Sequence, residues 1–406
     1  MVNPDKAGQR KFFILLGIIF LTFLWMGCSN LNSNDSEPEE ITPPPIEEPP
    51  RIEEFSIGAV GDIMVHEPQI KAAYVGGDQG YDFAPVFQPI KKYIEEVDIA
   101  IANLETTLSG AEQNYSGYPM FNSPEQMAEA LKLTGFDVIT TANNHSLDRR
   151  SHGVKSTLDY LDAQGLDHTG TARSQEEQDR VLIKNIRDVS IAFLAYTYGT
   201  NGIPIPDDQP YLVNLIDHER MERDIQRAKD MNVDLIVVSV HFGNEYQRHE
   251  SEEQKELVDF LLTQGVDVVL GSHPHVIQPM EIRQVTTVDG EEKEAFLIYS
   301  LGNFVSNQRD RYRDSGLILQ LYFQKNFETG RTSLERVEYI PTWVDKSNVD
   351  GKLQYRVLAV EDALSNYQED PLISQGDYEL LQRTWKDTTE HLEREDARMV
   401  VKPIGN

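Results

Sequence analysis

The sequence is poor in two classes of residue, and each scarcity excludes a kind of protein. Cys28 is the only cysteine among 406 residues, so no disulfide can form within the chain and thiolate-rich metal centres are excluded. Lysine and arginine number 37 against 67 aspartates and glutamates, which gives a formal net charge of −30. Such a chain repels nucleic acid and anionic membrane surfaces unless a local basic patch or a bound metal reverses the field. We therefore expect no nucleic-acid partner.

Three common catalytic signatures are also absent. The sequence contains no G-x-S-x-G elbow, no H-E-x-x-H pair and no Walker phosphate loop. Serine hydrolase, zincin and P-loop chemistries therefore lack their usual signatures here. Hydrophobic residues make up 39% of the chain, an ordinary proportion for a folded protein of enzyme size.

The first 28 residues have the pattern of an export signal. Basic residues at the start precede an apolar run over 12–27, and Cys28 follows directly. At about 16 residues, the run is slightly short for a membrane span. The position of Cys28 resembles a bacterial lipoprotein lipobox, although Trp25 stands where such sites usually carry leucine. We expect the chain to sit at the extracytoplasmic face of the cell membrane, held by lipid on Cys28 or by an uncleaved signal anchor.

The rest of the chain divides into three predicted parts. Residues 29–54 are rich in proline and glutamate and poor in large apolar side chains, which predicts a disordered spacer. Over 55–345, strand-like and helix-like segments alternate, and this order indicates a layered α/β domain. Residues 346–406 include a charged segment with a helical pattern, and we expect them to form a helical extension.

Polar groups follow five of the predicted strands, each at the carboxyl end of its strand. They are Asp62, Glu105, Asn143 to His145, His241, and His273 with His275. In parallel α/β sheets, right-handed crossovers bring the carboxyl ends of the strands to one edge. We therefore expect these side chains to converge in space although they are far apart in the sequence.

Each of these residues alone has a simpler interpretation. An aspartate after a strand commonly belongs to a turn or a helix cap, Asn143 and Asn144 suit a left-handed turn, and His241 suits a core histidine. Their joint placement favours a metal site, because carboxylate, amide and imidazole ligands together suit Zn, Mn or Fe. In such a site Glu105 would bridge two ions, and His145 would protonate a leaving group.

Six motifs, in order, carry a resemblance to a known family. They are GDIM (61–64), NLETTLSG (103–110), TANNHSLDRRSHG (141–153), VHFGNEYQ (240–247), GSHPHVIQP (271–279) and YSLGNF (299–304). Together they resemble the poly-γ-glutamate capsule biosynthesis proteins of the CapA/PgsA type over about residues 55–345. That family is similar to the calcineurin-like metallophosphoesterases. The resemblance implies a four-layer α/β/β/α sandwich of the α/β class that binds one or two divalent ions (Mn, Zn or Fe).

The resemblance also implies roles for individual residues. The metal ligands it implies are Asp62, Glu105, Asn144, His241, His273 and His275. His145 would contact the substrate and act as the catalytic acid. Two positions depart from the phosphoesterase pattern, because Met64 stands in place of a histidine and Glu105 in place of the bridging aspartate. His66 is a candidate substitute ligand; without one, the site should hold a single ion or bind the second loosely.

Asn103, Arg149 and Asn303 are the candidate substrate contacts. The resemblance implies a part in poly-γ-glutamate production, with membrane-bound polymer synthase subunits as partners and the polymer or another anionic compound as substrate. It leaves two functions open. One is a metal-dependent hydrolase or transferase, and the other is a non-catalytic component of the complex that makes and exports the polymer.

Overall fold

The computed structural model describes residues 50–77, 80–393 and 396–403. The predicted signal segment and residues 29–49 of the predicted spacer lie outside the described residues. Within these described ranges, no helix is both long enough and apolar enough to cross a membrane.

One sheet has nine strands arranged around a parallel centre. Its strands follow the order β16-β15-β14-β1-β4-β5-β6, with β13 beside β1 and β17 beside β15. The bounds are β1 Ile52–Ile63, β4 Ile99–Leu104, β5 Val138–Thr140, β6 Asp167–Thr169, β13 Asn303–Val305, β14 Ser315–Asn326, β15 Thr332–Val349, β16 Lys352–Ala359 and β17 Met399–Val401. β1, β4, β5 and β6 run parallel, whereas β14 is antiparallel to β1. The first strand of the sheet in sequence therefore lies in its middle, where Val60 pairs with both Ala102 and Ile318.

The second sheet has six strands and a parallel centre of its own. Its order is β11-β12-β10-β9-β8-β7, and β8, β9, β10 and β12 run parallel. The bounds are β7 Leu182–Ile186, β8 Val189–Thr197, β9 Leu235–His241, β10 Val268–Ser272, β11 Met280–Thr286 and β12 Glu292–Ile298. A separate hairpin joins β2 (Tyr74–Gly76) to β3 (Gly80–Tyr81).

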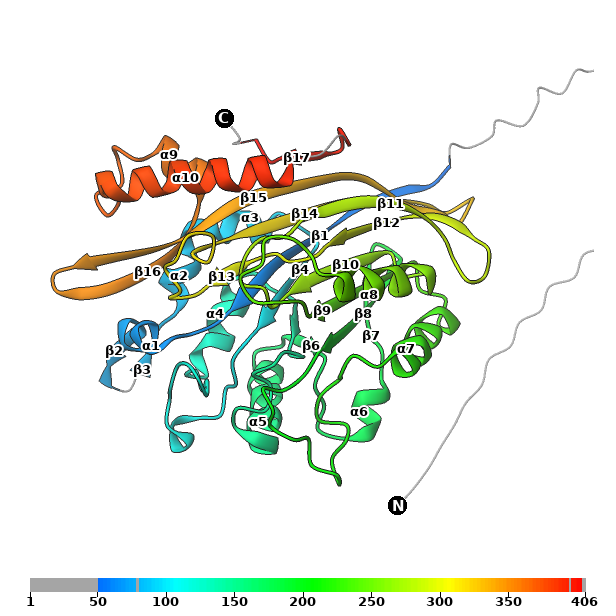
Figure 1. Cartoon of the computed structure of the whole chain (residues 1–406), viewed down its shortest axis with the longest axis horizontal. Helices are drawn as coiled ribbons and strands as arrows, with labels where there is room; N and C mark the ends of the chain where they lie inside the picture. The colour runs from blue at the N-terminus through cyan, green and yellow to red at the C-terminus, as the bar shows by residue number, and fades with distance from the viewer. Residues whose placement is uncertain (1–49, 78–79, 394–395, 404–406) are drawn as a thin grey trace, which may run out of the picture. The chain divides into compact units, whose positions relative to one another are not determined.

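The two sheets pack face to face, with helices on both outer faces. One hydrophobic cluster lies between the sheets and includes Ile57 and Ile99 from the first and Val237 and Val268 from the second. A second cluster joins the first sheet to helices α1 to α5, and a third joins the second sheet to α7 and α8. Figure 1 shows α7 and α8 beside β8 and β9. The predicted four-layer α/β/β/α sandwich is confirmed.

The helices are short or of moderate length. Their bounds are α1 Glu67–Ala73, α2 Ala84–Phe87, α3 Lys91–Glu95, α4 Gln126–Thr134, α5 Arg150–Ala163, α6 Gln175–Asp179, α7 His218–Asp230, α8 Glu252–Thr263, α9 Val360–Ser365 and α10 Gln375–Leu392, with 3-10 turns at Gln88–Ile90 and Ala111–Gln113. Helix α8 starts with a capping box in which Ser251 and Gln254 exchange hydrogen bonds. Helix α4 ends at Gly135, whose φ of 107° lies in the left-handed region that glycine tolerates.

The last part of the chain differs from the expected helical extension. α9 and α10 are helical, but β16 adds an antiparallel strand to β15 and β17 adds a parallel one. The predicted boundary at residue 345 falls inside β15. The charged segment forms helix α10, whose Leu381 belongs to the same hydrophobic cluster as the buried Trp343. Figure 1 shows α10 beside β15. The alternation of apolar and polar residues in KLQYRVLA over 352–359 marks the strand that the expectation missed.

Two glycines let backbones cross just before the predicted site residues. A Cβ on Gly61 would lie 2.0 Å from the carbonyl oxygen of Gly302, and a Cβ on Gly271 would lie 2.0 Å from that of Tyr299. The close approach at Gly61 accompanies a hydrogen bond of 3.0 Å from the Asp62 N–H to the same Gly302 oxygen. These contacts hold the carboxyl ends of β1 and β10 in register with the loop over 299–302.

We predict that Gly61→Ala lowers the free energy of unfolding by about 3 kcal/mol, because two backbones must separate to accept the methyl group. The matched control is Gly199→Ala, where an added Cβ meets no atom within 4 Å. Chemical denaturation of the two variants measures the difference. Equal stability of Gly61→Ala and the unmodified chain would show that the crossing can relax without cost.

Candidate metal centre

The carboxyl ends of the parallel strands from both sheets meet at one place. Asp62 is the penultimate residue of β1, Glu105 follows β4, His241 ends β9, and His273 and His275 follow β10. The Asp62 Oδ2 atom lies 3.1 Å from Nδ1 of His275, although these residues come from different sheets. All five side chains are buried, with at most 4% of their surface exposed. The structure therefore brings together residues that the sequence places far apart.

Glu105 is the most unusual group of this centre. Its side chain is fully buried, and neither carboxylate oxygen has a hydrogen-bond partner among the described residues. Burial and the nearby negative charge of Asp62 raise the pKa of Glu105 to about 8. A carboxylate that is buried without a hydrogen bond is costly, even with Nε2 of His241 at 3.5 Å and Nδ1 of His275 at 3.9 Å, and a cation is the partner that removes this cost. The orphaned oxygens fit a metal site.

The possible ligand atoms form overlapping groups. In each of two groups, one ligand atom per residue lies within 4.8 Å of the others; the groups are Asp62, Glu105 and His275, and Glu105, His241 and His273. Glu105 belongs to both, as a bridging carboxylate would. The Asn144 Oδ1 atom lies 2.9 Å from His241 Nε2, at the edge of the second group. One or two divalent ions are therefore compatible with these donors.

The charge states of the histidines agree with this assignment. Burial lowers the pKa of His241 to about 3 and that of His273 to about 2, so both imidazoles are neutral, the form that binds metals. Nδ1 of His273 is buried and lacks a hydrogen-bond partner. Burial would also lower the pKa of His275, but the charge of Glu105 and the hydrogen bond to Asp62 raise it to about 9.

His145 belongs to a hydrogen-bonded pair that sequence analysis missed. Its Nδ1 atom lies 2.7 Å from Oδ2 of Asp148, which also accepts a hydrogen bond of 2.6 Å from the Phe121 N–H. Burial opposes protonation of His145, but Asp148 and the charge of Glu105 raise its pKa. The ring of Phe121 packs edge-on against His145 at 4.7 Å between centroids. The sequence signal for this pair was the aspartate three residues after the histidine in NHSLD.

The three predicted substrate contacts lie in different settings. Asn103 donates a hydrogen bond of 2.8 Å to Asp62, and Oδ1 of Asn303 lies 3.1 Å from Nδ1 of His275, so both support ligand residues. Arg149 instead donates to the Ser116 hydroxyl at 2.7 Å and to the carbonyl of Asn114 at 3.3 Å. Its guanidinium is therefore already engaged by the loop that precedes α4.

Neither Met64 nor His66 supplies the histidine ligand that the phosphoesterase pattern has at the position of Met64. Met64 is buried with 2% exposure, and its thioether is a poor ligand for Zn, Mn or Fe. His66 caps the start of α1, and its Nδ1 accepts a hydrogen bond of 3.2 Å from the Asn307 N–H. Of the candidate ligand groups found among the described residues, none includes His66.

A further carboxylate approaches the centre from the loop after β9. Glu245 forms a third candidate group with His273 and His275, again with one ligand atom per residue within 4.8 Å. This residue lies in the motif VHFGNEYQ, and the sequence pattern predicts no role for it. The only sequence signal for Glu245 is its position four residues after the candidate ligand His241. This signal is weak, because Glu245 lies in a loop and not at the end of a strand.

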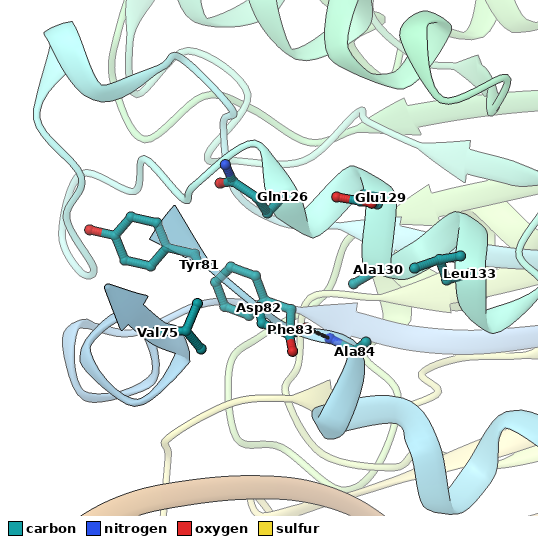
Figure 2. A pocket seen from close by; sticks show the side chains of 9 residues that line it. All are labelled: Val75, Tyr81, Asp82, Phe83, Ala84, Gln126, Glu129, Ala130 and Leu133. Carbon is teal, nitrogen blue, oxygen red and sulfur yellow. Dashed lines mark hydrogen bonds between the residues drawn. The ribbon is translucent and has the colours of Figure 1, made fainter. Parts of the chain in front are cut away.

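The structure also has a hollow that carries none of the predicted site residues. It has a volume of about 370 Å³ and lies between α2, α4 and the β2–β3 hairpin (Figure 2). Figure 2 shows Gln126, Glu129 and Leu133 of α4 on one side and Val75 and Tyr81 of the hairpin on the other. We therefore place the chemistry at the strand ends and not in this hollow.

We predict that Glu105→Gln weakens divalent metal binding by about 100-fold or more, because a neutral amide cannot act as an anionic bridge between ions. Metal content after dialysis against Mn²⁺ or Zn²⁺ measures the effect. Glu112→Gln makes the same exchange at a side chain that is 67% exposed and should bind as the unmodified chain does. Full metal content in Glu105→Gln would exclude Glu105 as a ligand.

Two relatives among curated proteins align with more than half of this chain. The chain is 28% identical over 380 residues to the PGA biosynthesis protein CapA of Bacillus subtilis (strain 168), a match that covers 91% of this chain and 92% of that protein. It is 30% identical over 277 residues to the capsule biosynthesis protein CapA of Bacillus anthracis. That match covers 66% of this chain and 63% of the relative, slightly less than two thirds of its length.

Solved structures with a similar course of the chain include two proteins of low sequence identity. The calcineurin-like phosphoesterase YfkN from Bacillus subtilis is 15% identical with a TM-score of 0.42, over 84% of this chain and 99% of that one. A putative 5'-nucleotidase from Staphylococcus aureus is 15% identical with a TM-score of 0.46, over 82% of this chain and 58% of that one.

The family model described as bacterial capsule synthesis protein PGA_cap matches residues 56–308, which is more than half of the sequence. The chain belongs to this family of bacterial capsule synthesis proteins.

Proposed function

We propose that this protein is a metal-dependent hydrolase or transferase that acts on a γ-glutamyl or phosphoester bond during synthesis of a poly-γ-glutamate capsule. One observation carries the proposal. The buried carboxylate of Glu105, without a hydrogen-bond partner, belongs to two candidate ligand groups, and the nearby His145 is oriented by its 2.7 Å contact with Asp148. A site that only stabilised the fold would have no need of an oriented proton donor beside its ligands.

The chemistry divides between the ions and the chain. Divalent ions bound here would polarise a substrate oxygen and lower the pKa of water toward neutrality. Asp62, Glu105, His241, His273 and His275 would hold them, with Asn144 at the edge. Each ligand is buried, so the surrounding protein excludes competing water and fixes the ligand atoms before substrate arrives.

His145 is the proposed proton donor. Asp148 accepts the hydrogen bond from Nδ1 at 2.7 Å, which fixes the orientation of the imidazole and leaves Nε2 to exchange a proton with the substrate. The proton would go to the nitrogen that leaves a γ-glutamyl bond or to the oxygen that leaves a phosphoester. Phe121 limits rotation of the ring from the other side, since its edge lies against His145.

The acidic chain can still accept an anionic substrate at this place. The net charge is −30, so the surface as a whole opposes a polymer of glutamate. Divalent ions held here would offset the carboxylates of Asp62 and Glu105 locally and would attract anionic groups. Arg149, already hydrogen-bonded to Ser116 and Asn114, is less suited to this task than the ions are.

The location and partners form part of the same proposal. The apolar run over 12–27 and Cys28 support an anchor in the cell membrane, with the described residues on the extracytoplasmic face. Membrane-bound polymer synthase subunits are then the natural partners, because they would deliver the growing chain to this face. The names of the Bacillus relatives, which refer to capsule and PGA biosynthesis, support this assignment.

A non-catalytic role in assembly of the complex is the second candidate. The observation that favours it is Met64, a buried thioether at a position where the phosphoesterase pattern has a metal-binding histidine. A weakened metal position would matter less to a protein that uses the fold only to bind partners.

We predict that His145→Ala reduces polymer production in a complemented deletion strain by about 100-fold or more, the usual contribution of a general acid. The variant should keep its metal content and its place in the membrane fraction, because His145 belongs to none of the candidate ligand groups among the described residues. Polymer released from the cells is the measured quantity.

His152→Ala is the matched control, since that histidine lies on α5 with a side chain that is 53% exposed. It should support normal production. If His145→Ala also supports normal production while metal content and membrane association persist, the catalytic proposal fails and the assembly role takes its place.

A further inference from the structure

The loop after β9 returns the chain toward the turn that carries His273 and His275. Gly243 and Tyr246 both have positive φ angles, of 94° and 67°, and these two residues reverse the direction of the backbone. The Tyr246 N–H then donates a hydrogen bond of 2.8 Å to the carbonyl of Pro274, which lies between the two histidines. Glu245 is thereby placed next to the ligand turn.

The loop after β9 is exposed to solvent, but hydrogen bonds from a buried glutamine side chain fix its backbone. Gln278 is fully buried, and its side-chain amide donates to the carbonyls of Gln247 at 2.8 Å and His249 at 3.1 Å. Gln254 of α8 in turn donates to Gln278 at 2.8 Å. The guanidinium of Arg313 also lies 3.8 Å from the ring centroid of Tyr246. A side chain on such a fixed backbone loses little entropy when it binds an ion.

The carboxylate of Glu245 meets two imidazoles of the candidate metal centre. One ligand atom from each of Glu245, His273 and His275 lies within 4.8 Å of the others. His273 is 4% exposed, and its Nδ1 atom is buried without a hydrogen-bond partner, so it is a donor atom prepared for a ligand. Glu245 itself is solvent-exposed, which places it on the side from which ions and substrate enter.

We propose that Glu245 is a metal ligand that compensates for the histidine missing at Met64. The inference rests on the metal centre of the proposed function and adds the identity of one ligand and a preference among metals. A carboxylate in place of an imidazole makes the donor set harder, and harder sets favour Mn²⁺ relative to Zn²⁺. The centre of this chain is thus a manganese-preferring variant, completed from a loop and not from the end of β1.

The test measures metal binding by the full chain, purified in detergent micelles and stripped with a chelator. Mn²⁺ is titrated and the free ion is followed by electron paramagnetic resonance, while Zn²⁺ affinity is measured by competition with a coloured chelator. Glu245→Gln, which keeps the size of the side chain, should weaken Mn²⁺ binding by about tenfold or more and Zn²⁺ binding by a smaller factor. Its metal-free thermal unfolding should match that of the unmodified chain, because the residue is exposed.

Glu253→Gln is the matched control. Glu253 lies in the first turn of α8 beside the same loop but belongs to none of the candidate ligand groups among the described residues. Its Mn²⁺ affinity should equal that of the unmodified chain.

Equal Mn²⁺ affinity of Glu245→Gln and the unmodified chain overturns the inference, and so does an unmodified chain that binds no Mn²⁺. An equal loss of Mn²⁺ and Zn²⁺ affinity keeps Glu245 as a ligand and overturns the metal preference. All three results come from metal binding and are independent of polymer production, which decides the proposed function through His145. Failure of one proposal is therefore distinguishable from failure of the other.

Discussion

A buried carboxylate without a hydrogen-bond partner is the constraint around which the site is organised. Glu105 follows a strand that is buried at every residue, so its charge cannot reach solvent. Nearby groups respond to that charge: His275 holds its proton more tightly because of it, and His145 does so as well. Asn103 and Asn303 then orient Asp62 and His275. The neutral His241 and His273 complete a donor set of carboxylates and imidazoles that suits a divalent cation.

The fold must meet two requirements to place the buried Glu105 carboxylate among ligands from both sheets. Two parallel sheet centres must end at the same place, and the loops between them must pass close enough for ligands from both sheets to touch. The backbone crossings at Gly61 and Gly271, where an added Cβ would meet a carbonyl oxygen at 2.0 Å, satisfy the second requirement. The core between the sheets satisfies the first, because it fixes β1 and β4 against β9 and β10.

The sequence predicts the layered fold and the strand-end groups for a clear physical reason. Strands buried on both faces read as continuous apolar runs, and a polar residue at the end of such a run is conspicuous. Asp62, Glu105 and His241 were found in this way. Asp148 and Glu245 were missed because they lie in loops, where acidic residues are common and only three-dimensional contacts distinguish them.

Other differences have equally local causes. Arg149 looks like an exposed cation in the sequence, yet its guanidinium is bound by a loop more than thirty residues earlier in the chain, a contact that no periodic pattern encodes. The strand β16 was hidden by the stronger helical pattern that follows it. The tight backbone approach at Gly302, next to Asp62, likewise has no signature beyond the glycine itself.

The position of β1 sets an order on how the molecule can fold. β1 occurs first among the described strands, but it lies between β4 and β14, with Val60 paired to Ile318. Its pairing with β14 waits until most of the chain has been synthesised, and contacts of such long sequence separation form slowly. Asp62, near the end of β1, can contact His275 only at that stage. An incompletely synthesised chain thus carries its candidate ligand residues apart, and metal binding would require the completed protein.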